Sequence, residues 1–433
     1  MVFVRIRFRH ALAIPLLLAF FIATRLPAGQ SLDRVAAETN VNQQYVIESV
    51  SISGIQLDGA ENAKLPGALR ERLNSLVGAR CDMNVLNEVS DQLRRELHLR
   101  AVSQRLLRGS QPGRIRVNFE IEQRPASFDV AVPKFLYHSE QKFSGEVDAI
   151  VRASHNTLTL GATSNGDDLT ERFTGAAIRY DNSQIGSDRV RFGVEFDEFH
   201  EQWRPSTVAA AGTDGDFNLY HARRNIAPQL TFVVAKPFTI SVGTSFEQME
   251  SGTPHGPDQS ANALTADLRF NRGFEGTLFQ QQVGASYSLR TGFRGLGSDY
   301  AYSRHLVTVR YEVRSGRQLA RDEFMGGMIA GDAPMFERFV LGSSETLRGW
   351  DRYVIDPLGG TRVVHNSITY GYQIHEGTAE VFYDAGALWE PTREAKLRHS
   401  VGVAYRQGIF VLTMAFPVVD GHIAPVFMAG MNY

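Results

Sequence analysis

Few residues of this chain have the types and spacing that enzymatic chemistry requires. The pairs His200-Glu201 and His375-Glu376 begin like the zinc-binding helix pattern H-E-x-x-H, but neither is followed by the second histidine. The chain has no G-x-S-x-G nucleophile elbow and no glycine-rich phosphate loop, and its one cysteine, Cys81, is too few for a cysteine-ligated metal. We therefore expect no enzyme, no metal site and no cofactor. A lipase with an outward-facing Ser/His pair is the enzymatic alternative that the sequence leaves open.

Two charged motifs near the C-terminus offer ionic chemistry instead. One is Leu347-Arg348-Gly349-Trp350, in a long loop predicted at 331–361. The other is Phe382-Tyr383-Asp384-Ala385-Gly386, in the second of five amphipathic stretches that follow this loop and run to Tyr433. Side chains of a strand alternate between its two faces, so Asp384 shares the polar face with Glu380, Phe382 and Gly386, whereas Ala379, Val381, Tyr383 and Ala385 share the apolar face.

The elements that must position these motifs are strands of the same amphipathic kind, which follow one another from about Phe143 to the end. Val190, Phe192, Val194 and Phe196, for example, alternate with charged residues and a glycine. Lipid on one face and a polar lumen on the other require this alternation. We count about 15 such segments, and a closed single-chain barrel of this type takes an even number. The sequence thus predicts an all-β transmembrane β-barrel at 142–433 with about 16 antiparallel strands, 14 being the alternative.

A soluble β-sandwich would also show alternation, because each of its strands is half buried. The N-terminal segment argues against that alternative. Residues 1–30 carry four arginines and no acid, and the apolar run from Ala11 to Ala23 is shorter than the ~20 residues that a membrane helix needs. We interpret 1–30 as a signal peptide, so the chain is expected to be exported. The ionised lumen-type faces and the aromatic last residue also favour the barrel.

Residues 45–124 have the pattern of a small α+β unit. A strand from Val46 to Ile52 is followed by two helices with apolar residues at helical spacing and then by two strands that turn at 109–113. Cys81 is expected to pack in its core. This order of elements, placed before a barrel, resembles the polypeptide-transport-associated (POTRA) domain, a periplasmic module. Such a module would offer sheet edges to extended client chains by β-augmentation.

The region from Gly331 to Tyr433 resembles the BamA/TamA superfamily of outer-membrane assembly factors, also called bacterial surface antigens. The resemblance depends on the ordered combination of Leu341-Gly342, the Arg348 motif, Pro357-Leu358-Gly359-Gly360 and the Phe-x-Asp-x-Gly strand. Residues 143–330 agree only in strand pattern. One POTRA-like unit is fewer than the tandem array of the main assembly factor, which leaves the exact task of this chain open.

The resemblance implies that the loop folds into the lumen and that Arg348 engages Asp384. Removing one member of a buried ion pair costs on the order of 3 to 5 kcal/mol, so the pair would fix the loop in place. Gly349 would permit the tight turn at the tip of the loop. The alternative is that Arg348 and Asp384 are solvated charges that never meet. The residues expected at this contact between loop and barrel are Arg348, Gly349, Trp350, Asp384, Gly386, Phe382 and Glu380.

The closing seam of the barrel is the second candidate site. The last strand, expected from about His422 to Tyr433, contains Pro425, which lacks a hydrogen-bond donor, and Gly430, which weakens a strand. A weakened seam could open sideways and pair with incoming strands, as in the assembly factors of the family. The alternative is that Pro425 merely starts the strand.

These observations predict an outer-membrane assembly or insertion factor with its N-terminal unit in the periplasm. Its partners would be outer-membrane lipid, unfolded outer-membrane or secreted client proteins, and accessory periplasmic proteins. A formal net charge of -2 gives no basic excess, so we expect no nucleic acid. The alternatives are a two-partner-type translocation pore for one secreted protein and a passive porin.

Overall fold

The structure is a computed structural model that describes residues 44–53, 67–97, 99–122, 126–131, 133–140, 142–165, 172–214, 219–252, 256–276, 278–342, 344, 346–419 and 422–431. The predicted signal peptide at 1–30 and the terminal Tyr433 lie outside these ranges. No helix in these ranges has the length and apolarity to cross a bilayer.

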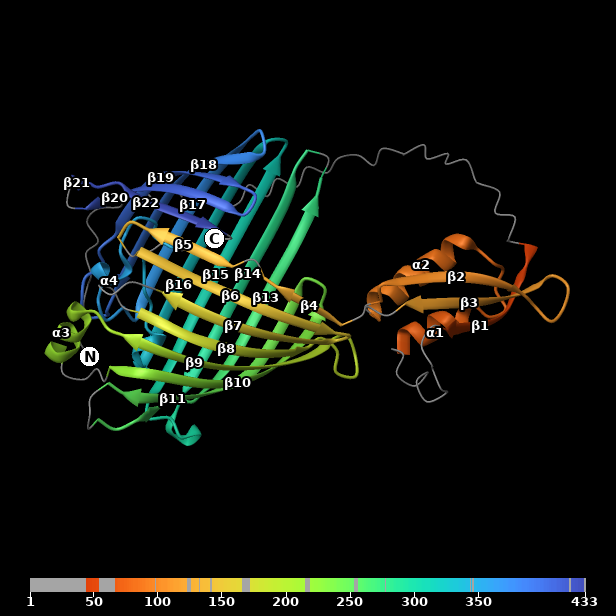
Figure 1. The fold of residues 1–433 in the computed structure, drawn as a ribbon, viewed down its shortest axis with the longest axis horizontal. Helices are drawn as coiled ribbons and strands as arrows, with labels where there is room; N and C mark the ends of the chain where they lie inside the picture. Colours follow the sequence, from red (N-terminus) through yellow and green to blue (C-terminus); the bar gives the residue numbers. More distant parts are fainter. Residues whose placement is uncertain are drawn as a thin grey trace, which may run out of the picture.

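The N-terminal unit is a three-stranded sheet with two helices (Figure 1). Its central strand β3 is parallel to β1 and antiparallel to β2. The order strand, helix, helix, strand, strand is the expected one. Its elements are β1 (Val46–Ser53), α1 (Gly67–Leu76), α2 (Met83–Glu96), β2 (Ala101–Arg108) and β3 (Arg114–Glu122).

Apolar residues at helical spacing hold this unit together. Leu69 and Leu73 of α1 and Val89 and Leu93 of α2 are buried in one cluster with the sheet. Cys81 belongs to the same cluster and is completely buried, in the position expected of a core residue. The carboxylate of Asp82 accepts a hydrogen bond from the Asn84 amide and thus caps the N-terminus of α2.

The remaining strands form a closed antiparallel barrel (Figure 1). Within the described ranges it has 16 strands, three of which are each divided into two pieces, and this confirms the predicted fold class. The strands in chain order are β4 (Ser127–Val130) with β5 (Lys134–His138), β6 (Lys142–Ala153), β7 (Asn156–Asn165), β8 (Arg172–Asn182), β9 (Val190–Gln202), β10 (Tyr220–Ala235), β11 (Phe238–Ser251), β12 (Gln259–Ser260) with β13 (Ala263–Glu275), β14 (Gln280–Gly292), β15 (Ala301–Ser315), β16 (Gln318–Asp332), β17 (Arg362–Ile374), β18 (Gly377–Trp389), β19 (Arg398–Gln407), β20 (Phe410–Val419), and β21 (His422–Ile423) with β22 (Val426–Met431).

The barrel begins earlier than predicted. We expected it from 142, but β4 and β5 together form its first strand, since both pair with β6. The two pieces are separated at 131–133, where Pro133 lacks the donor that a continuous ladder needs. A pattern broken in this way has too few alternating residues on either side to be recognised as a strand.

Alternation of exposure along the strands separates a lumen face from an outer face. In β18, Val381 and Tyr383 are 53% and 41% exposed, whereas Glu380, Phe382 and Asp384 are 4%, 5% and 0% exposed. The predicted polar face of this strand therefore points into the barrel.

The long loop between β16 and β17 packs inside the barrel. It contains a short 3-10 turn, η4 (Met335–Glu337), and one helical turn, α4 (Arg352–Ile355). Its apolar residues form a cluster with the wall, which contributes Tyr302, Ile329, Val363 and Leu388 among others. The buried loop residues of this cluster are Ala333, Phe339, Leu341, Leu347, Trp350 and Ile355. Two further elements lie in other loops, α3 (Pro205–Asp214) and η3 (Arg294–Leu296).

Candidate functional site

The structure brings Arg348 and Asp384 together in a two-pronged contact. Arg348 Nε and Nη2 donate to Asp384 Oδ2 and Oδ1 at 2.8 and 2.6 Å, and the Arg348 backbone amide donates to Oδ2 at 3.0 Å. Arg348 Nη2 also donates to Ser367 Oγ on β17 at 2.8 Å. The Asp384 side chain is 0% exposed and that of Arg348 17%. We call this contact the tip anchor, because it holds the tip of the loop to β17 and β18.

Phe382 connects the tip anchor to the closing seam of the barrel. Arg348 Cζ lies 3.5 Å from the centroid of the Phe382 ring, a cation–π contact. Phe382 also belongs to a buried cluster with Leu136 of β5, Ala415 of β20 and Met428 of β22. A continuous contact thus runs from the tip anchor to both strands of the seam.

Two of the predicted glycines make room for the loop. Gly349 has φ of +87°, and a Cβ atom on it would lie 2.8 Å from the Ala415 Cβ atom. A Cβ atom on Gly386 would lie 2.9 Å from Leu341 Cδ2, a loop atom. Gly349 is therefore required for both its backbone conformation and its close approach to β20, whereas Gly386 lets Leu341 pack on β18.

Trp350 and Glu380 have other partners than Arg348. Trp350 Nε1 donates to the His399 carbonyl oxygen at 3.0 Å, which attaches the tip to β19. Glu380 is on the lumen face as expected, but its ion pair is with Arg406 of β19, at 3.8 Å. We expected Glu380 at the Arg348 contact, and this is corrected: Glu380 shares a strand face with Asp384, but its ion-pair partner is Arg406.

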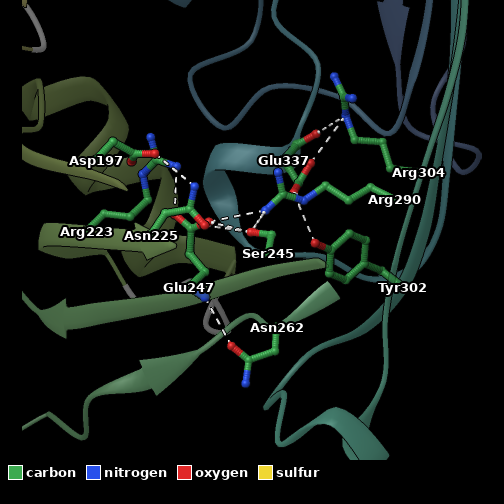
Figure 2. Close-up of polar contacts among 10 residues, drawn as sticks. All are labelled: Asp197, Arg223, Asn225, Ser245, Glu247, Asn262, Arg290, Tyr302, Arg304 and Glu337. Atoms are coloured by element: carbon green, nitrogen blue, oxygen red, sulfur yellow. Dashed lines mark hydrogen bonds and ion pairs between the residues drawn. The ribbon is translucent and has the colours of Figure 1, made fainter. Parts of the chain in front are cut away.

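A second set of polar contacts holds the base of the loop, and the sequence did not reveal it (Figure 2). Glu337, the last residue of η4, forms ion pairs with Arg290 of β14 and Arg304 of β15 and accepts a hydrogen bond from Tyr302. Alternation alone places both arginines on the lumen face, but it cannot say which of the many lumen charges meet a loop residue.

Among the described residues, the seam is the shortest pairing between complete strands of the barrel. β22 pairs with β5 through four residue pairs, from Met428↔His138 to Met431↔Phe135, whereas β15 and β16 share fifteen. Gly430 lies within this pairing, opposite Leu136. Pro425 is exposed and lies between β21 and β22, so the last strand is divided there.

In the described part of the chain, no group of three His, Cys, Asp or Glu side chains is arranged so that it could hold a metal ion. The candidate site is therefore a mechanical one, in which a loop is fixed inside a barrel and its tip lies beside a short seam.

Comparisons with known proteins agree with the barrel fold. A family model described as Omp85 superfamily domain matches residues 156–409. No curated protein matches. Among solved structures, the chain is similar to BamA from Haemophilus ducreyi lacking POTRA domains 1-3, at TM-score 0.67 and 14% identity over 89% of this chain and 84% of that chain. It is also similar to CdiB from Acinetobacter baumannii, at TM-score 0.55 and 13% identity over 90% of this chain and 74% of that chain.

Proposed function

Because this chain belongs to the Omp85 superfamily, we propose that it assembles other proteins into the outer membrane, by docking client chains on its N-terminal unit and pairing them at the barrel seam. The family resemblance expected from the sequence is confirmed, and a barrel of this family implies an outer-membrane location. The location of the N-terminal unit in the periplasm is part of the proposal.

The observation that carries the proposal is the contact between the tip anchor and a short seam. When two strands of a barrel separate, the backbone hydrogen bonds between them break. The described seam has four residue pairs, so few such bonds must break there. Phe382 lies in one buried cluster with Leu136 and Met428, so the ring on which Arg348 stacks belongs to the packing that supports the seam. Withdrawal of Arg348 would remove that support and leave strand edges on which a client strand can pair.

The N-terminal unit offers a docking edge of the same chemical kind. The sheet order β1-β3-β2 makes β2 an edge strand. Its outer residues are exposed, and Leu107 is 40% exposed. An extended client segment could add to this edge through backbone hydrogen bonds, which give affinity without demanding one sequence.

Depletion of the chain tests the proposal directly. We would profile the outer-membrane proteins of depleted cells and of cells rescued with wild type, Arg348→Ala or Asp384→Ala. Broad loss of other barrels, restored by wild type and by neither variant, is the expected result. Loss of a single secreted protein would instead indicate a translocation pore, and an unchanged profile would favour a passive porin.

Closure of the seam by a disulfide tests the proposed mechanism. Tyr137 and Ala429 face each other across the seam, so Tyr137→Cys with Ala429→Cys, in a Cys81→Ala background, should form a disulfide. The matched control joins Val309→Cys to Phe324→Cys, a facing pair on the neighbouring strands β15 and β16. Assembly should stop in the oxidised seam variant, return on reduction, and continue in the oxidised control. Full activity of the oxidised seam variant would contradict the proposed pairing of clients at an open seam.

A further inference from the structure

Glu337 connects the base of the long loop to strands other than those that hold Arg348. Its side chain is almost fully buried, with Oε1 2.5 Å from Arg290 Nε and 3.0 Å from the Tyr302 hydroxyl, which donates to it. Arg304 Nε lies 3.5 Å from Oε2 and donates to the Glu337 backbone oxygen at 2.9 Å. We call this set the base anchor. It joins the loop to β14 and β15, whereas the tip anchor joins it to β17 and β18.

The base anchor completes a charge network that already exists in the wall (Figure 2). Glu247 of β11 is 0% exposed and pairs with Arg223 and Arg290, at 2.7 and 3.2 Å. Asp197 of β9 is bonded to the network through the amide of Asn225. Only Glu337 of these carboxylates comes from the loop, and it is the carboxylate that Arg304 pairs with, whereas Arg290 also has Glu247. Without Glu337, the largely buried Arg304 would lose its ion-pair partner, which is unfavourable.

The two arms of the loop, before and after its tip, are also joined to each other at this level. Phe339 and Gly360 exchange backbone hydrogen bonds of 2.9 Å in both directions. Arg338 donates to the carbonyl oxygens of Leu358 and Gly359 and pairs with Glu390, which follows β18. These bonds hold the two arms together at the base of the loop, and Glu337 attaches this base to β14 and β15.

We propose that Glu337 is a positioning residue that keeps the base of the loop on β14 and β15 when the tip leaves Asp384. The loop then moves as a plug with a hinge at its base. Arg348 leaves Asp384 and the tip swings, while the base stays on β14 and β15 and guides Arg348 back to Asp384. This inference concerns the protein without a client, so its test does not depend on the proposed assembly function.

Two introduced cysteines, each added separately to the chain that keeps Cys81, distinguish movement of the base from movement of the tip. Ala263→Cys lies at a fully buried wall position that faces Gly292, against which Tyr302 of the base anchor packs. Ser400→Cys lies at a fully buried wall position opposite Asp384, near the tip. Labelling by a small water-soluble thiol reagent is measured in the purified protein, with the reporter-free chain and its buried Cys81 as background.

Each anchor should protect its own reporter. Arg348→Ala should speed labelling at Ser400→Cys by about tenfold or more and leave Ala263→Cys as slow as in the parent. Glu337→Gln, which keeps the shape and removes the charge, should speed labelling at Ala263→Cys. Glu376→Gln, the same change on an exposed turn, should alter neither rate.

A charge exchange tests whether the effect is specific. Glu337→Arg should expose Ala263→Cys strongly, and adding Arg304→Glu should restore part of its protection, because the ion pair between positions 337 and 304 is re-formed with its charges reversed, whereas the contact with Arg290 is not. Retained heat-modifiable mobility identifies folded barrels, and Glu337→Asp replaces Glu337→Gln if the latter does not fold. The proposal is overturned if Arg348→Ala exposes both reporters equally, or if removal of the Glu337 charge leaves Ala263→Cys protected.

Discussion

Arg348 meets Asp384 with both prongs of its guanidinium, and a lysine could not reproduce that contact. Arg348→Ala would leave the fully buried Asp384 carboxylate without its partner, so we expect a loss of about 3 to 5 kcal/mol in barrel stability. Arg348→Lys keeps the charge but loses the planar fork, and its loss should be smaller. The shift in unfolding temperature measures both. Equal stability of wild type and Arg348→Ala would show that the pair contributes nothing to the fold.

Gly349 allows a test that separates backbone strain from crowding. Gly349→Ala adds a Cβ atom 2.8 Å from the Ala415 Cβ atom at a residue whose φ is +87°, whereas Gly408→Ala has a similar φ, +57°, and no atom within 4 Å. Strain alone costs about 1 to 2 kcal/mol at each. Gly349→Ala should therefore destabilise more than Gly408→Ala and should also weaken the tip anchor, as measured by labelling at Ser400→Cys. Equal effects of the two substitutions would contradict the close packing of the tip on β20.

At the scale of elements, the N-terminal unit has its own reporter in Cys81. The thiol is completely buried, and burial raises its pKa, so little reactive thiolate exists at neutral pH. We expect alkylation of Cys81 in the folded protein to be very slow even at about pH 8 and complete after denaturation. Its rate then measures opening of this unit separately from the barrel. Rapid alkylation of the native protein would contradict the packed core around α1 and α2.

Elements with an unbroken period could be predicted from the sequence, and interrupted ones could not. The alternation through β18 correctly placed Phe382 and Asp384 on the lumen face, because a period of two fixes the face of every residue. The first strand was missed since Pro133 divides it. The contact of Arg348 with Asp384 came from a family resemblance, and the base anchor was missed, because loop residues such as Glu337 have no periodicity that relates them to a wall.

Of all the strand pairings in the barrel, we expect the seam between β5 and β22 to separate first. The β5–β22 pairing has four residue pairs and Pro425 beside it, whereas β15 and β16 share fifteen pairs and a tight turn. Protection of an amide from exchange reflects the free energy of the opening that exposes it. Hydrogen exchange in a lipid bilayer should therefore be faster in β5 and β22 than in β15 and β16. Uniform protection around the barrel would show that the seam is as stable as the other pairings.

Glu337 also carries a consequence for ion selectivity. In the described part of the chain, Arg304 has its carboxylate partner only while the loop supplies Glu337. A barrel from which the whole loop had withdrawn would present this unpaired arginine to the lumen and would favour the passage of anions there. A swing of the tip alone would leave this ion pair intact, so the same barrel would discriminate less between ions when only its tip has moved.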